Sequence, residues 1–418
     1  MKTEQELYRR KNDFFIKISS STRGALVFCL VFSVVVFVLA ITMGSGTRVW
    51  GAFLFNLMLF FSLALGGVAF GHMQDMIGAL WGRPIKRIHE SFGAFVPWAA
   101  LALVLFFLCI KFKLGDAHKV YSWIASPGSL SAFPGKSCWL TPGFMMIRDL
   151  GAMAVLVALV LWQRQISTRA DFLVLQGREE EAEQSALEAT QRLRMCSAPI
   201  LVVYALCFSL LSFDLTMSLA PTWLSTLWGG WNFAIMMQVL LASTLLAMFA
   251  LQSSAVGGYF ARNNFHDIGK LLFGFTVFFA YLTYAHVLTY WYTNMPEETS
   301  YLITRMGAPW LKYVIAAPFI SFLFPFILLI PKANKWTSHI AIPVCVVVLA
   351  AQWLNSMLVV MPELVNAGEW HGPWLELAIS LGFLAAFLLS VFTYAEKTPM
   401  LSLADPLLHR SLDERVHH

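Results

Sequence analysis

Several ionisable and phenolic side chains stand inside long apolar stretches of this sequence. A charged group in hydrocarbon costs at least ~2.5–3.5 kcal/mol on insertion scales, so each should face protein or water. Asp and His change charge at accessible pH, and Tyr hydroxyls both donate and accept hydrogen bonds, so a chain of such groups can relay protons. The candidate residues are His72, Asp75, Arg148, Asp149, Asp214, Asp267, Lys270, Tyr281, Tyr284 and His286.

Their spacing places several of them on shared helix faces. His72 and Asp75 are three residues apart, which puts them on one side of a helix. Arg148 and Asp149 lie six or seven residues into their apolar stretch, roughly 10 Å deep at ~1.5 Å per residue. Asp214 lies toward the end of the next stretch.

The stretch at 265–292 carries the most polar groups. Helical spacing predicts one stripe that begins at Asp267 and Lys270 and continues through Gly274, Val277, Tyr281 and Tyr284. A neighbouring stripe contains Thr283, His286 and Tyr290. These helix faces either line a polar path or form interhelical hydrogen bonds worth about 0.6–2 kcal/mol each.

The elements that hold these groups follow from composition. Hydrophobic residues make up 58% of the 418 residues and charged residues only 13%, whereas a soluble domain is roughly 25% charged. A soluble enzyme is thereby excluded. Stretches near the ~20 residues needed to cross a bilayer predict an all-α integral membrane protein of about ten transmembrane helices, at 24–43, 50–78, 92–110, 142–163, 197–219, 231–256, 268–292, 308–330, 338–361 and 374–395.

The predicted organisation is an N-terminal segment 1–23, a transmembrane domain 24–395 and a C-terminal tail 396–418. The N-terminal segment lacks a signal-peptide cleavage site, so the first stretch is expected to stay as an anchor. Most of the 29 Lys and Arg residues fall on the N-terminal side of the spans, which predicts that both termini are cytoplasmic. A charged helical segment at 164–196 is expected on that side, and a loop at 111–141 on the other.

The six cysteines are scattered singly, without C-x-x-C spacing. The chain therefore shows no motif for an iron–sulfur cluster, a zinc site or covalently attached haem. We expect no metal site and no catalytic residue of its own. Gly66-Gly67 are candidate helix-breaking positions, and Pro318, Pro325 and Pro331 predict a kinked eighth span.

Three motifs carry a family resemblance: WLTPGFMMIR at 139–148, FDLTMSLAPTWLST at 213–226 and FHDIGKLLFGFTVFFAYLTYAHVLTYWYTNMPEET at 265–299. They resemble the F subunit of bacterial alternative complex III, a quinol:electron-acceptor oxidoreductase whose membrane subunits belong to the polysulfide reductase/NrfD-like family. The resemblance covers roughly residues 50–395. Matching positions are Arg148, Asp214, Trp223 to Thr226, His266, Asp267, Lys270, Tyr281 and Pro296 to Thr299.

The resemblance implies two four-helix bundles with peripheral first and last helices, in the bacterial inner (cytoplasmic) membrane. It implies a respiratory-chain complex with a homologous C-type membrane subunit, an iron–sulfur subunit and multihaem cytochrome c subunits. The C subunit holds the principal quinol site. This chain is then a subunit without a redox centre, a scaffold that can conduct protons. It departs from the family at Tyr284-Ala285-His286 and at Asp149, where it adds titratable groups.

Two other functions remain open from the sequence. A direct quinol-binding and quinol-oxidising subunit would use His286 with Asp149 or Asp214 as proton acceptors, because a quinone needs an apolar slot with one or two polar groups at its head. A stand-alone secondary transporter would use broken helices near the midplane.

Overall fold

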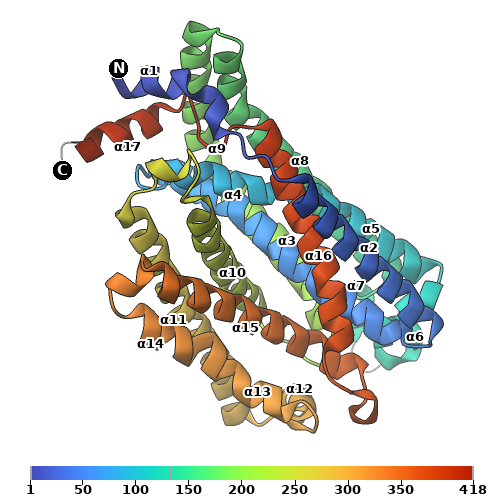
Figure 1. Cartoon of the computed structure of the whole chain (residues 1–418). Coiled ribbons are helices and arrows are strands. Elements are labelled where there is room, and N and C mark those ends of the chain that lie inside the picture. The colour runs from blue at the N-terminus through green and yellow to red at the C-terminus, as the bar shows by residue number, and fades with distance from the viewer. Residues whose placement is uncertain (1, 131–133, 417–418) are drawn as a thin grey trace.

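The computed structural model describes residues 2–130 and 134–416. Residues 131–133 of the predicted 111–141 loop, and His417 and His418 of the predicted tail, lie outside the described residues. Every regular element in the described ranges is helical, with no strand among them. Figure 1 shows long helices side by side, with both chain ends at the same end of the bundle; we call this the terminal end and the other the distal end.

Within the described part of the chain, ten helices are long and apolar enough to cross a membrane, and each overlaps one of the ten predicted stretches. This confirms the all-α prediction and indicates a multi-pass membrane protein. The spans are α2 (Ser20–Thr42), α3 (Gly46–Ile77), α4 (Lys86–Phe92) with α5 (Val96–Lys111), α8 (Pro142–Leu175), α9 (Glu179–Leu215), α10 (Trp228–Leu251), α11 (Arg262–Thr293), α13 (Leu311–Pro318) with α14 (Phe324–Leu329), α15 (Ser338–Leu364) and α16 (Trp374–Lys397).

The remaining helices are short and lie at the two ends of the bundle. They are α1 (Lys2–Arg9), α6 (Ser122–Ala125), α7 (Pro134–Trp139), α12 (Pro296–Met306) and α17 (Pro406–Val416). Local chemistry sets several boundaries. The Ser19 side chain accepts the Thr22 N–H at 3.0 Å and caps α2, and α3 ends at Gly78, whose φ of +63° suits glycine.

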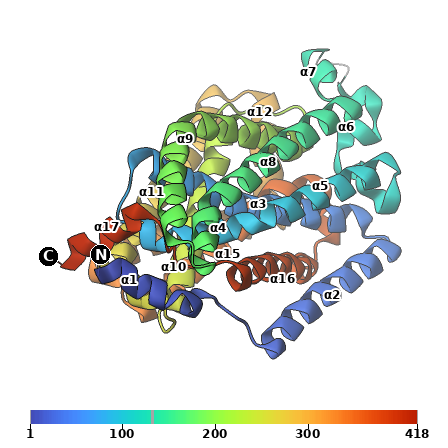
Figure 2. The ribbon, with the colours of Figure 1, turned by 90° about the horizontal axis from the view of Figure 1, so that it is seen from above.

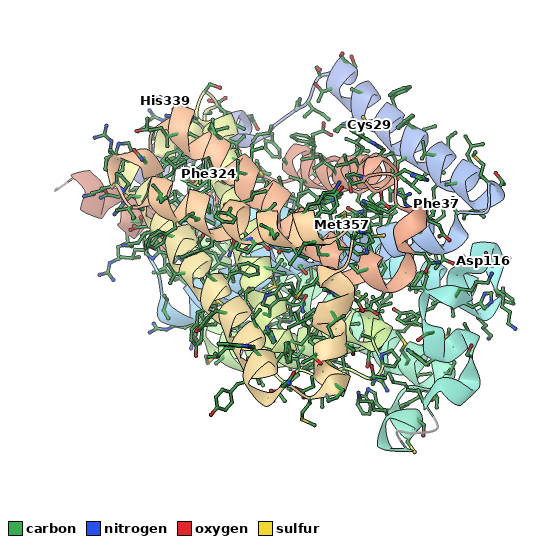
Figure 3. All side chains as sticks on the ribbon, turned by 90° about the horizontal axis from the view of Figure 1, so that it is seen from below. Cys29, Phe37, Asp116, Phe324, His339 and Met357 are labelled. Carbon is green, nitrogen blue, oxygen red and sulfur yellow. The ribbon has the colours of Figure 1, made fainter. Side chains whose placement is uncertain are left out.

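The centre of the molecule is α3, which packs against α4, α9, α10, α15 and α16. In its most apolar window 89% of the residues are buried, against 11% for α2. Figure 2 shows α2 at the edge of the molecule. Phe37, labelled in Figure 3, packs on Trp50 and Phe53 of α3 at 4.9 and 5.9 Å. The rest of α2 exposes Phe28, Val31 and other apolar side chains, so it requires apolar surroundings.

The charged segment 164–196 is helical, as the sequence predicts. Its helices are continuations of the spans α8 and α9, which meet at Gly177, whose φ is +78°. Figure 1 shows this helical hairpin projecting from the terminal end. Glu, Gln, Ala and Leu dominate the segment and are good helix formers, so only the glycine interrupts it.

The glycine pair in α3 does not break the helix. A Cβ on Gly67 would lie 2.5 Å from the His89 carbonyl oxygen, and one on Gly66 would lie 2.9 Å from the Met236 side chain. Both glycines therefore allow close approach of α4 and α10. The kink predicted in the eighth span is confirmed as a π-helical turn at Phe319–Leu323, directly after Pro318.

Candidate functional site

Many of the buried ionisable side chains gather into two clusters, one near each end of the bundle. The pairs Arg48–Glu376 and Arg305–Glu363, at 2.7 and 2.8 Å, lie outside them. The terminal cluster lies between the end of α3, the start of α4, the α8–α9 pair and the segment before α17. Its central ion pair joins Arg83 Nη1 to Asp75 Oδ1 at 2.6 Å. Lys86 Nζ lies 3.5 Å from the same oxygen. Asp405, far along the chain, lies 3.5 Å from Arg83 and 3.9 Å from Lys86.

Asp405 lies outside the spans and is buried. Burial by itself raises the pKa of its carboxyl, but Lys86 and Arg83 outweigh that effect and hold the pKa below the usual 3.8. Asp405 also accepts the Leu407 N–H at 3.0 Å, which caps the first turn of α17. One carboxylate thus docks the C-terminal segment on α4.

A second group of charges adjoins the first. Arg87 donates to Glu90 and to Asp171. Ser167 Oγ donates to Glu90 Oε1 at 2.6 Å, and the Tyr394 hydroxyl donates to Glu90 Oε2 at 3.2 Å. The three charged side chains and the two hydroxyls each have a complementary partner, as buried ions require.

His72 extends the terminal cluster toward the middle of α3. Its Nδ1 lies 3.0 Å from Ser197 Oγ, and that hydroxyl already donates to the Leu193 carbonyl. The His72 Nδ1–H is therefore the donor, which leaves Nε2 as a proton acceptor. The His72 and Tyr204 rings lie 5.7 Å apart. Among the described residues neither His72 Nε2 nor the Tyr204 hydroxyl has a hydrogen-bond partner.

The distal cluster is built on α8 and α9. Arg148 Nε donates to Asp214 Oδ2 at 2.5 Å, and Trp139 Nε1 donates to Asp214 Oδ1 at 3.1 Å. The Arg148 guanidinium also stacks over the Trp139 ring at 4.0 Å. These contacts hold the Asp214 carboxyl group between two donors, Arg148 and Trp139.

Asp149 is fully buried beside Asp214. In the described part of the chain neither of its carboxyl oxygens receives a hydrogen bond from another donor. The hydrogen bond open to it is one with the Asp214 carboxyl, which needs a proton between the two. Tyr121, in the loop beside them, has its phenol pKa raised by burial and then by the charges of Asp149 and Asp214.

His286 belongs to neither cluster. It faces inward at the distal end of α11, with Nε2 2.7 Å from Ser225 Oγ. Its ring lies 6.4 Å from Trp228 and 6.1 Å from Tyr290. The surroundings are aromatic, and its polar partner is a hydroxyl.

The remaining predicted positions lie on the outer face of α11. Asp267 and Lys270 pair with each other at 3.0 Å. The side chains of Tyr281 and Tyr284 are 63% and 64% exposed. The stripe exists as the spacing predicts, but it points away from the bundle, and no hydrogen bond among the described residues joins it to either cluster.

Sequence reasoning missed the partners in the terminal cluster. The predicted spans leave Arg83 to Arg87 between two helices and place Asp171 and Asp405 in the charged segment and the tail. One signal was available: the basic and acidic residues of 83–90 alternate with Ile85, Ile88 and Phe92, as in a helix with one packed face. The partners Arg83, Lys86, Arg87, Glu90, Asp171, Tyr394 and Asp405 become neighbours only when the chain folds.

The polar residues at the middle of α15 form interhelical hydrogen bonds. Gln352 Nε2 donates to Gln238 Oε1 at 2.8 Å, and Trp353 Nε1 donates to Ser380 Oγ at 2.7 Å. Residues 2–130 and 134–416 contain no group of three or more His, Cys, Asp and Glu side chains placed to hold a metal ion.

No protein-family model matches the chain, and no curated protein matches its sequence. The class of protein rests on the fold, that of a multi-pass helical membrane protein with buried ionisable clusters. The resemblance carried by the three motifs remains a prediction.

Proposed function

We propose that this chain is a membrane subunit of a quinol:electron-acceptor oxidoreductase of the alternative complex III type, which anchors the complex and conducts protons. Its three motifs resemble the F subunit of that complex. The partners are then a C-type membrane subunit, an iron–sulfur subunit, which carries iron–sulfur clusters, and multihaem cytochrome c subunits, which carry haem c. The site is the bacterial inner membrane, with both termini cytoplasmic.

The packing supports the arrangement that this family implies. In the proposed arrangement one four-helix bundle is α3, α4 with α5, α8 and α9, and the other is α10, α11, α13 with α14, and α15. Helices pack on neighbours within each set, and α3 also packs on α10 and α15 of the other set. The peripheral first and last spans, α2 and α16, pack on each other and on α3.

The observation that carries the proton proposal is the placement of Asp149 beside Asp214, with no other donor. A carboxyl pair that shares a proton binds and releases it as the neighbouring charge changes. At the terminal end His72 Nε2 offers a free acceptor. Asp75, three residues along α3, pairs with the buried Arg83 and Lys86. Both ends lie on the inner faces of α3, α8 and α9.

Between the ends the inner face of α9 is apolar except for Ser212, whose hydroxyl donates to the Phe208 carbonyl. From Tyr204 to Asp214 the helix rises about 15 Å at ~1.5 Å per residue, and Phe208 and Leu211 fill that interval. Proton transfer across it requires water that enters during turnover. The two clusters are then half-paths separated by an apolar barrier.

The test is Asp149→Asn in the intact complex reconstituted into liposomes. We expect quinol oxidation to continue while proton translocation falls at least ten-fold. Asp116→Asn, on an exposed loop carboxylate, is the control and should change neither. Proton translocation at the wild-type level in both Asp149→Asn and Asp75→Asn would leave a scaffold only.

A direct quinol-binding role at His286 is the second candidate, favoured by its aromatic surroundings and its Ser225 contact. In that case His286→Ala lowers quinol oxidation, and Asp149→Asn lowers it as well. An unchanged rate of quinol oxidation in His286→Ala removes this candidate. A stand-alone transporter predicts purification as a single polypeptide, whereas the complex predicts co-purification with haem-containing subunits.

A further inference from the structure

A cavity of about 720 Å³ lies between α15 and α16 and is backed by α3 and α10. Its wall is apolar, with residues such as Leu63, Val239, Leu349 and Leu384. The polar side chains that reach it are three serines and Trp353, and no charged residue lines it. Sites for small molecules span ~300–1,000 Å³, so the space is large enough for a bound molecule.

The cavity exists because two consecutive helices diverge. Figure 1 shows α15 and α16 leaving their short connection in different directions, with α3 and α10 behind them. Near the distal end the Trp353–Ser380 hydrogen bond ties the two helices together at 2.7 Å. At the terminal end the cavity is lined by Ile16, Ala395 and Met400.

One flank of the cavity is open to the surroundings of the bundle. Val346 on α15 and Leu381 on α16 line it and remain 52% and 45% exposed. In a bilayer this flank faces lipid tails. A hydrocarbon chain matches the wall, whereas a polar molecule would lose its hydrogen bonds on entry.

A basic pocket adjoins the terminal end of the cavity. It is lined by Lys17, Ser20, Arg23 and Glu396, and it follows directly after Ile16 and Ala395 along the chain. Lys17 is exposed and forms no ion pair among the described residues. Arg23 Nη2 lies 2.6 and 2.5 Å from the two carboxylate oxygens of Glu396. Because this pair is neutral, Lys17 gives the pocket a net positive charge.

The N-terminus of α2 adds a second attraction for anions at the same place. The helix is 23 residues long and begins at Ser20, which lines this pocket. The Ser19 side chain occupies the Thr22 N–H, so the N–H groups of Ser20 and Ser21 are the ones left for an anion. A helix N-terminus and an unpaired lysine together favour a phosphate group. The site for a hydrocarbon chain and the site for a phosphate therefore adjoin each other beside the segment that connects residue 14 to α2.

We propose that an anionic phospholipid binds at this junction, with its phosphate at Lys17 and the α2 N-terminus and one acyl chain in the cavity between α15 and α16. The lipid fills the space that α15 and α16 leave between them. It also connects the peripheral pair α2 and α16 to the body of the molecule. The site is separate from both ionisable clusters and does not depend on the proposed redox role.

The test measures lipid retained by the purified protein, in its native assembly, by native mass spectrometry. Phosphatidylglycerol and phosphatidylcholine with identical acyl chains are added in turn. We expect preferential retention of phosphatidylglycerol. Lys17→Glu should weaken it at least about five-fold, as removal of one basic contact to an anionic lipid predicts. Lys397→Glu, on an exposed lysine outside the pocket, should leave retention unchanged.

Filling the cavity tests the acyl-chain part separately. Ala247→Phe on α10 and Ala350→Phe on α15 place a ring in the cavity from two sides. Each should reduce phosphatidylglycerol binding, whereas Val34→Phe on the exposed face of α2 should not. Equal retention of both lipids with no effect of Lys17→Glu overturns the headgroup site. Binding that survives both ring insertions, displacement by an isoprenoid quinone, or a partner helix that excludes lipid overturns the cavity site.

Discussion

At the scale of single residues, the same kind of ion pair contributes very differently to stability in different surroundings. Arg87 with Glu90 and Arg178 with Glu181 are both pairs at i,i+3. The first pair is buried with Ser167 and Tyr394 around it, and the second is more than half exposed on both sides. Removal of one member leaves an uncompensated buried charge in the first case and a solvated charge in the second.

Arg87→Ala should therefore destabilise the protein by about 3–5 kcal/mol, and Arg178→Ala by about 0–1 kcal/mol. The measurement is thermal unfolding of both variants in the same detergent. Equal unfolding temperatures for the two variants would mean that the terminal cluster does not hold the helices together.

At the scale of elements, close helix contacts depend on particular glycines. Gly67 lets the α4 backbone approach α3, because a Cβ there would lie 2.5 Å from the His89 carbonyl oxygen. Gly274 on α11 has no atom within 4 Å of its ideal Cβ position. The two positions look alike in sequence, as helical glycines in apolar spans.

Gly67→Ala should destabilise the protein by about 1–3 kcal/mol, the usual cost of overpacking. Gly274→Ala should be neutral or stabilising by up to about 1 kcal/mol, since alanine is the better helix former. The unfolding curves of the two variants show whether each substitution destabilises or stabilises the protein. A stabilised Gly67→Ala variant would contradict the close α3–α4 packing.

The C-terminal segment is held as an element by Asp405, which pairs with Arg83 and Lys86 and caps α17. Asp405→Ala should release residues 398–412, and limited proteolysis should cut that segment much faster than in the wild type. Asp13→Ala, which removes an exposed partner of Arg10, is the control. Unchanged protection in Asp405→Ala would mean that apolar contacts alone dock the tail.

The same contact has a pH dependence. The folded-state pKa of Asp405 lies below the usual 3.8, so its stabilising effect is present above about pH 4. We expect protection of the tail to be equal at pH 7 and pH 5. It should be lost only as the pH falls below 3.8 toward the folded-state pKa. A loss of protection between pH 7 and pH 5 would assign docking to another titratable group.

At the scale of the whole molecule, the proposed proton path depends on the apolar barrier between its two clusters. Leu211 is fully buried in that barrier, and Leu206 on the same helix is 67% exposed. Both belong to α9 and differ only in the side they face. A hydroxyl in the barrier gives water a hydrogen-bonding partner.

Leu211→Ser should raise the passive proton leak of liposomes that contain the complex by several-fold, and Leu206→Ser should not. The measurement is the decay of an imposed pH gradient, followed with an entrapped dye. If folded Leu211→Ser leaks protons no faster than the wild type, the two clusters are not connected by a path through this barrier.

The sequence alone determined that the spans of this protein suit a hydrocarbon environment and that they are helices. Runs of about twenty apolar residues require helices in hydrocarbon, because no other backbone conformation satisfies its own hydrogen bonds there. The ten spans, the helical stripe on α11 and the inward placement of His72, Asp75, Asp149 and Asp214 follow from that single constraint. Each depends only on residues close in sequence.

Only the tertiary structure decided which groups meet. Asp75 and Asp405 share two cations although hundreds of residues separate them, and Glu90 meets Tyr394 in the same way. The direction in which a stripe points was also undetermined, since Tyr281 and Tyr284 obey the same spacing as a buried face but lie outside. Local spacing sets the side of a helix on which a residue lies, and only packing between helices sets what that side touches.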